Sequence, residues 1–143
     1  MGIKKLIIKP EQSGKTFIML EEIRKHLTSS DNNGYPVNFI ISQCNLLQVK
    51  QTGSRINEDP DLMYQRDLDS DDVYVEFSSK SDKNKAYEIM DYIQCSPKQG
   101  VKPIILCCGH PKRFSDISFI INRLRMYPGG DNYNINVWCD EAD

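Results

Sequence analysis

Two short stretches near opposite ends of the sequence carry residue types that could together hold a phosphate chain. The first is Lys9–Thr16, KPEQSGKT, in which a glycine, a lysine and a hydroxyl residue follow one another. The second is Asn136–Asp143, NVWCDEAD, which contains two adjacent acids. A lysine can reach phosphate oxygens, a threonine hydroxyl can ligate Mg²⁺, and a carboxylate can hold the same ion through water. We therefore expect the rest of the chain to bring both stretches to one phosphate site.

The lysine-containing stretch stands where a strand is expected to pass into a helix. A strand predicted over Ile3–Ile8, which ends in the apolar run Leu6–Ile8, precedes it, and Gly14–Leu27 follows with apolar residues at helical spacing. A loop that wraps over a helix start offers backbone N–H groups and the positive end of the helix dipole to an anion. Lys15 would add its charge near the outer phosphates, and Thr16 would bind Mg²⁺. The alternative is a chance Ser-Gly-Lys-Thr turn at the start of a helix.

The acidic stretch begins in an apolar run, Ile135–Cys139, that predicts a strand. At the end of this strand, two adjacent acids can take different roles in phosphate chemistry, one in metal binding and one in activating water. Asp140 would hold Mg²⁺ through water, because this ion keeps most of its hydration shell. Glu141 would orient or deprotonate an attacking water. Taken alone, the acids would be interpreted as a solvated tail, and their combination with a phosphate loop favours the catalytic interpretation.

Strands and helices are expected to alternate along the whole chain. The predicted strands are Ile3–Ile8, Val37–Ser42, Val73–Phe77, Pro103–Cys108 and Ile135–Cys139. Helices are expected over Gly14–Leu27 and around the apolar stripe Phe114–Leu124. Two more are expected to begin at caps: one runs from Asn45 to about Ile56, and the other starts at Ser81 and is ended by Pro97 and Gly100. This alternation predicts a mainly parallel sheet with helices on both faces and ligands at the carboxyl ends of the strands. A chain of 143 residues without a linker is expected to form one domain.

Charge and cysteine content narrow the class of protein. The net charge of −2 argues against a protein that is basic over its whole surface, although it allows a local basic stripe. Five cysteines without a regular spacing favour a reducing, intracellular compartment such as the cytoplasm or nucleus. No apolar run approaches the roughly 20 residues that a membrane helix needs, so no membrane partner is expected.

The two end motifs resemble those of superfamily-two helicases. Lys9–Thr16 resembles the Walker A motif, although the usual pattern has glycine at the position of Lys9, and Asp140–Asp143 reads DEAD, the family's form of the Walker B motif. Ser42–Thr52 and Cys108–Arg113 stand where the family carries strand-binding motifs. The strings EQSGKT and NLLQVKQT are similar to helicase-like proteins of large DNA viruses. The resemblance covers the whole chain, and the end motifs carry nearly all of its specificity.

The resemblance implies a RecA-like P-loop NTPase domain over residues 1–143, an α/β three-layer sandwich with a mostly parallel sheet of about five strands. It implies an ATP-dependent helicase or ATPase with ATP and Mg²⁺ as cofactors, single-stranded DNA or RNA as partner and, for a viral protein, a host cell as location. By matching positions, Glu141 and Lys15 would be catalytic, and Thr16 and Asp140 would bind Mg²⁺. The matching phosphate-binding residues are Glu11, Gln12, Ser13, Gly14, Lys15 and Thr16. The candidates for nucleic-acid contacts are Asn45, Lys50, Gln51, Arg55, Lys112 and Arg113.

Three features of the family are not found in the sequence. The first is the Ser-Ala-Thr-type motif with its strand, which in the family lies between the phosphate-loop strand and the acidic strand. We expect a gap there, a rearranged sheet, or pairing with another chain. Another absent feature is the family's C-terminal RecA-like domain, which carries the arginine finger. The third is the glutamine motif that reads adenine. We therefore expect a truncated, N-terminal part of a larger helicase that hydrolyses nucleotide poorly, because arginine fingers contribute roughly 10³–10⁵ in rate.

Two other functions fit parts of the same pattern. One is a different P-loop enzyme, although the guanine-reading Asn-Lys-x-Asp of a GTPase is not found, and a small kinase would need an arginine-rich lid after the acidic strand. The other is a non-catalytic interaction module that keeps a nucleotide-binding fold. The retained Lys15, Thr16, Asp140 and Glu141 argue against such a module.

Two further features of the sequence suggest sites but favour ordinary packing. Cys107, Cys108 and His110 are close enough in sequence to suggest a metal. Adjacent strand residues point to opposite faces, so both thiols cannot easily reach one ion, and buried strand cysteines are favoured. His26 has no evident partner and is expected on the exposed side of its helix.

Overall fold

The computed structural model of the chain describes residues 5–8, 15–28, 34–42, 46–59, 62, 73–77, 83–109, 111–126 and 132–140. Within these ranges, strands and helices alternate from the first element to the last. The strands are β1 (Lys5–Ile8), β2 (Tyr35–Ser42), β3 (Val75–Phe77), β4 (Ile104–Cys108) and β5 (Tyr133–Asp140). The helices are α1 (Lys15–Thr28), α2 (Leu46–Glu58), α3 (Lys83–Gln99) and α4 (Pro111–Met126).

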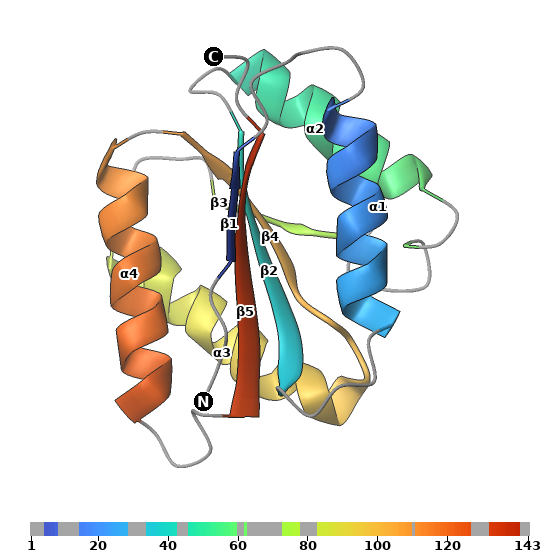
Figure 1. Ribbon diagram of the computed structural model, residues 1–143. Coiled ribbons are helices and arrows are strands. Elements are labelled where there is room, and N and C mark those ends of the chain that lie inside the picture. Colours follow the sequence, from blue (N-terminus) through green and yellow to red (C-terminus); the bar gives the residue numbers. More distant parts are fainter. Residues whose placement is uncertain are drawn as a thin grey trace.

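The five strands form one parallel sheet in the order β1-β5-β2-β4-β3. The predicted α/β class, with a mainly parallel sheet of about five strands, is therefore confirmed. The chain passes from β1 through β2 to β3 with α1 and α2 on one face, and returns through β4 to β5 with α3 and α4 on the other (Figure 1). If all the crossover connections have the same handedness, the helices must change face at the point where successive strands begin to be added in the opposite direction across the sheet.

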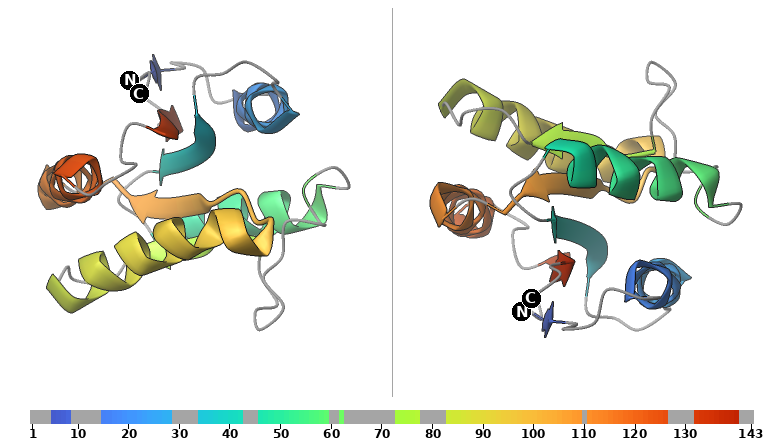
Figure 2. Two further views of the ribbon diagram at one scale, coloured as in Figure 1. Left: turned by 90° about the horizontal axis from the view of Figure 1, so that it is seen from below. Right: turned by 90° about the horizontal axis from the view of Figure 1, so that it is seen from above.

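The helices cover both faces of the sheet. α1 packs over β5 and β2, and α2 packs over β4 and β2. On the opposite face, α3 and α4 contact each other as well as the sheet. Figure 2 shows the helices on either side of the strands in two views turned by 90° from Figure 1. Because both faces are covered, β4 is buried at every position, as expected for a strand with a continuous apolar sequence.

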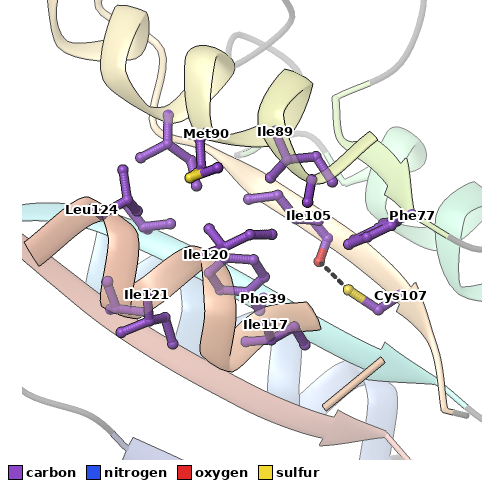
Figure 3. Close-up of a cluster of buried hydrophobic side chains, with 14 of the residues drawn as sticks. Phe39, Phe77, Ile89, Met90, Ile105, Cys107, Ile117, Ile120, Ile121 and Leu124 are labelled. Atoms are coloured by element: carbon purple, nitrogen blue, oxygen red, sulfur yellow. Dashed lines mark hydrogen bonds between the residues drawn. The ribbon is translucent and has the colours of Figure 1, made fainter. Parts of the chain in front are cut away.

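A large hydrophobic cluster fills the space between the sheet and the pair α3 and α4. Phe39 and Ile105 of the central strands meet Met90 of α3 and Leu124 of α4 in this cluster (Figure 3). Cys107 lies in the same cluster, where its thiol lies 3.9 Å from the backbone carbonyl of Ile105. The apolar stripes of both helices therefore bury the faces that their sequence spacing predicts.

A second hydrophobic cluster lies between the sheet and the pair α1 and α2. Its members from the helices are Met19, Leu20, Ile23, Leu27, Val49 and Ile56. Trp138, the single tryptophan of the chain, lies in this cluster with 1% of its surface exposed. It is two residues before Asp140 on β5, so the cluster reaches close to the end of the strand that carries the acidic motif.

The end of α3 differs from the sequence prediction. The helix continues through Pro97 to Gln99 and ends at Gly100, whose φ is +73°. The N–H of Val101 donates to the carbonyl of Ser96 at 3.1 Å, and the N–H of Gly100 faces the carbonyl of Pro97 at 3.4 Å. These two bonds are those of a Schellman cap, which needs the left-handed backbone that glycine allows. Pro97 lies within the last turn without ending the helix, so the end of α3 is marked by Gly100.

The sheet has no gap between the phosphate-loop strand and the acidic strand. β1 pairs directly with β5, from Lys5 opposite Asn136 to Ile8 opposite Cys139. The family's strand order would place another strand between these two. The described sheet instead corresponds to the rearranged alternative, in which β1 and β5 are neighbours. The end of β1 and the end of β5 are consequently immediate neighbours.

Candidate nucleotide site at the carboxyl edge of the sheet

Of the predicted nucleotide-site residues, the structure describes the first two residues of α1 and the last residue of β5. α1 begins at Lys15, and Thr16 is its second residue. β5 ends at Asp140. Glu11, Gln12, Ser13, Gly14 and Glu141 lie outside the described residues. The helix start therefore falls on the lysine of the motif, where the first N–H groups of a helix have no partner within it.

The start of α1 and the end of β5 lie at the same edge of the sheet. α1 follows β1, the neighbour of β5, and packs over β5 and β2. Trp138, two residues before the end of β5, lies in the cluster beneath α1, so this helix covers the last part of the strand. The sequence predicts that the two stretches form one site, and the described start of α1 and end of β5 lie at one edge of the sheet.

Ser42 is a residue at this edge that sequence reasoning did not single out. It ends β2 and is the register partner of both Asp140 on β5 and Cys108 on β4. Only 1% of its surface is exposed, although its hydroxyl is polar. A serine that closes the apolar run Phe39–Ile41 is the sequence signal that could have identified it.

A buried hydrogen-bonded junction connects α1 to the sheet beneath it. The side-chain oxygen of Asn38 on β2 lies 2.8 Å from the indole Nε1 of Trp138 and 2.9 Å from Nδ1 of His26 on α1. An indole N–H only donates, so this oxygen accepts from Trp138, and it also accepts from a protonated Nδ1 of His26. The expectation of an exposed His26 was therefore wrong. The residue lies one turn after the core residue Ile23, a spacing that could have placed it at the edge of the core.

Three of the nucleic-acid candidates lie on one exposed face of α2. Lys50, Gln51 and Arg55 are exposed, while Val49 and Ile56 of the same helix lie in the core, so the three candidates are on the side of α2 that faces away from the sheet. Leu47, one turn earlier, is 61% exposed on the same face. Asn45 lies outside the described residues. The helix therefore presents a basic and partly apolar face.

The remaining candidates on α4 have opposite environments. Lys112 is exposed in the first turn of α4. Arg113 is only 4% exposed, its guanidinium lies 4.1 Å from the ring centroid of Phe77, and its Nη1 is 3.4 Å from Asp116. The expectation that Arg113 contacts a nucleic-acid backbone is therefore corrected, because its charge is buried between a ring and a carboxylate. Lys112 keeps its place as a candidate.

The two adjacent cysteines of β4 face opposite sides of the sheet. Cys107 lies in the cluster under α3 and α4, and Cys108 lies in the cluster under α1 and α2. Burial raises the pKa of the Cys107 thiol far above its ordinary value, and the nearby charge of Arg113 opposes this only in part. Among the described residues, which do not include His110, no group of three or more metal-binding side chains occurs.

No family model matches the chain, and no curated protein or solved structure matches it. In the described ranges, none of the helices has the length and apolar character that crossing a membrane requires.

Proposed function

We propose that the chain is the ATP-binding part of a nucleic-acid-dependent ATPase, a RecA-like P-loop domain that binds Mg-ATP between the start of α1 and the end of β5. One observation carries the proposal. The helix that begins at Lys15 and the strand that ends at Asp140 share an edge of the sheet. This placement supports the proposal, because Lys15 and Asp140 are far apart in the sequence and a helix start at a sheet edge is a favourable place for a phosphate chain.

The residue types at this edge suit a magnesium-bound triphosphate. Lys15 supplies a positive charge at a helix start, where backbone N–H groups also favour an anion. Thr16 and Asp140 supply a hydroxyl and a carboxylate, and oxygen donors are the ligands that Mg²⁺ prefers. Glu141, the next residue, would orient the attacking water. The bound ion would neutralise phosphate charge during the transfer.

A nucleic-acid strand would cross the same edge of the sheet between the starts of α2 and α4. β2 and β4 are neighbours, but the helices that follow them cover opposite faces. Ligands of open α/β sheets bind at such a switch point, outside the carboxyl ends of the strands. Lys50 and Arg55 on α2 and Lys112 on α4 are exposed basic residues on helices that begin at this edge. We propose backbone phosphate contacts for these three residues.

One observation favours a second candidate, a P-loop phosphotransferase unrelated to helicases. The direct pairing of β1 with β5 differs from the strand order that the helicase resemblance implies, in which another strand separates them. The proposed nucleotide site is the same in both candidates. They differ in whether a single strand binds and stimulates hydrolysis.

Calorimetric titration of Mg-ATP into the wild type and the Lys15→Ala variant tests the nucleotide site. We expect the variant to lose binding, because its phosphate-facing charge is removed. Lys25→Ala is the matched control, since Lys25 is an exposed lysine on the same helix and its contact with Glu22, at 4.0 Å, lies on the surface. Equal affinities of the wild type and Lys15→Ala for Mg-ATP would refute the nucleotide site.

ATP hydrolysis with and without a single-stranded oligonucleotide separates the two candidates. The helicase-type candidate predicts weak hydrolysis that DNA or RNA single strands stimulate, with the remainder of the machinery on a second domain. Binding of Mg-ATP without any binding of a single strand at low salt would favour the phosphotransferase.

A further inference from the structure

The outer surface of α3 and α4 carries two aromatic rings and a cation in mutual contact. The rings of Tyr87 and Phe119 meet edge to face, with centroids 6.0 Å apart and planes at 86°. The guanidinium of Arg123 lies 5.9 Å from the centroid of Tyr87 and 5.7 Å from that of Phe119. Tyr87 is 43% and Phe119 36% exposed, so these rings lie outside the core. The two helices thus hold a positive charge against aromatic surface that water can reach.

Two charged side chains beside this aromatic pair form no ion pair with another described residue. Arg123 forms no ion pair with another described residue, and its Nε is buried without a hydrogen-bond partner. Such a group costs free energy until an acceptor reaches it. Asp91 is exposed one turn after Tyr87 on α3, and none of the ion pairs in the described ranges includes it. A cation and an anion therefore flank the rings without pairing to each other.

These side chains form a self-complementary surface, which we name the α3–α4 patch. It consists of Tyr87, Asp91, Phe119, Arg123 and Met126, the last of which is 74% exposed on the same side of α4 as Phe119. Aromatic residues, methionine and arginine are the types enriched in protein interfaces. The acid lies on one helix and the base on the other. A two-fold axis through the rings would therefore bring each acid to the base of the other copy.

We propose that the α3–α4 patch is the contact surface of a symmetric dimer of this chain. In a two-fold interface every contact occurs twice: if residue i of one copy contacts residue j of the other, then residue j of the first contacts residue i of the second. Asp91 of one protomer pairs with Arg123 of its partner, and the reverse pair forms at the same time. The rings of both copies pack together at the centre. A nucleic-acid strand fits this patch less well, because its phosphates would meet Asp91 as well as Arg123.

Sedimentation equilibrium of the whole chain up to about 300 µM tests the dimer, since interfaces of modest size associate in the micromolar range. We expect a reversible dimer that weakens at high salt. Arg123→Glu and Asp91→Lys should each weaken it about 30-fold, because each creates two like-charged pairs across the axis. A one-to-one mixture of the two variants should associate again, since every pair across the axis then has opposite charges.

The matched control is Arg55→Glu, which makes the same charge change on α2, on the opposite face of the sheet, and should leave the dimer unchanged. Denaturant unfolding of each variant shows that it is folded, and Asp91→Lys changes only an exposed side chain. A wild type that remains monomeric at every concentration would overturn the proposal. So would a mixture of Arg123→Glu and Asp91→Lys that stays monomeric, or an Arg55→Glu variant that weakens the dimer equally.

Discussion

The indole N–H of Trp138 donates a 2.8 Å hydrogen bond to the side-chain oxygen of Asn38, which also accepts from His26 at 2.9 Å. One amide on β2 thus connects the strand that ends at Asp140 to the helix that begins at Lys15. Both connections are made from a fully buried side chain. The relative position of the two proposed halves of the nucleotide site depends on this junction as well as on the sheet.

Replacing Asn38 by leucine should destabilise the protein. The change keeps a similar volume but leaves the donors of Trp138 and His26 without their acceptor, for a loss of about 2–4 kcal/mol in the free energy of unfolding. Urea unfolding followed by circular dichroism measures this loss. Asn122→Leu on the exposed side of α4 is the control and should change stability by no more than about 0.5 kcal/mol. A variant at position 38 as stable as the wild type would show that the junction contributes little.

Arg113 and Lys112 should respond oppositely to the same substitution. Arg113→Met removes a buried cation from the ring of Phe77 and should cost about 2 kcal/mol of stability, without a specific effect on single-strand binding. Lys112→Met removes an exposed charge, so it should leave stability within about 0.5 kcal/mol and weaken single-strand binding. Parallel unfolding curves and oligonucleotide titrations measure both effects. A stable Arg113→Met variant with impaired binding would reverse the correction made for this residue.

Alkaline pH should destabilise the fold through Cys107. Burial raises the pKa of this thiol in the folded state, so the unfolded chain releases its proton first as the pH rises. The stability is fully present below the pKa of the unfolded thiol and falls above it, by about 1 kcal/mol near pH 9.5. Denaturant midpoints of the wild type and Cys107→Val are measured at neutral and alkaline pH. Comparing the two proteins separates the effect of Cys107 from that of Tyr35 and Tyr133, whose pKa values burial also raises. An identical pH dependence of both proteins would contradict the account.

The exposed face of α2 should determine how single-strand affinity depends on salt. Arg55→Ala should weaken binding and lower the slope of log affinity against log salt by about 0.7, the contribution of one single-strand phosphate contact. Lys98→Ala, an exposed lysine in the last turn of α3 on the other side of the sheet, should change neither quantity. Fluorescence anisotropy of a labelled oligonucleotide over a salt series measures both. Equal slopes for the wild type and Arg55→Ala would remove α2 from the interface.

The strands and helices could be predicted from local patterns because each buries the face that its own spacing defines. The apolar runs that end at Ile8, Ser42 and Cys108 became β1, β2 and β4, and the stripe containing Met90 became α3. The order of the strands in the sheet was harder to predict than the strands themselves. Nothing local states that β1 pairs with β5, because that pairing depends on where a crossover of more than 20 residues returns.

The environment of single side chains was the least predictable feature. Arg113 follows Lys112 in sequence and was grouped with it, but Phe77 from a distant strand covers its guanidinium. His26 and Asn38 are polar residues beside apolar stripes, and only the packing of α1 on β2 shows that they meet. Contacts between elements far apart in sequence decide such cases, and one sequence does not reveal them.

The central claim is that Thr16 and Asp140 serve one magnesium-bound triphosphate. A double-mutant cycle in the calorimetric affinity for Mg-ATP, with Thr16→Val, Asp140→Asn and their combination, tests it most directly. We predict that the combined loss differs from the sum of the single losses by about 0.5–3 kcal/mol, because both residues act on one ion. Thr16→Val combined with Asp91→Asn, which lies on the opposite face of the sheet, should show additive effects. Additive effects of Thr16→Val and Asp140→Asn, or a wild type that does not bind Mg-ATP, would contradict the account.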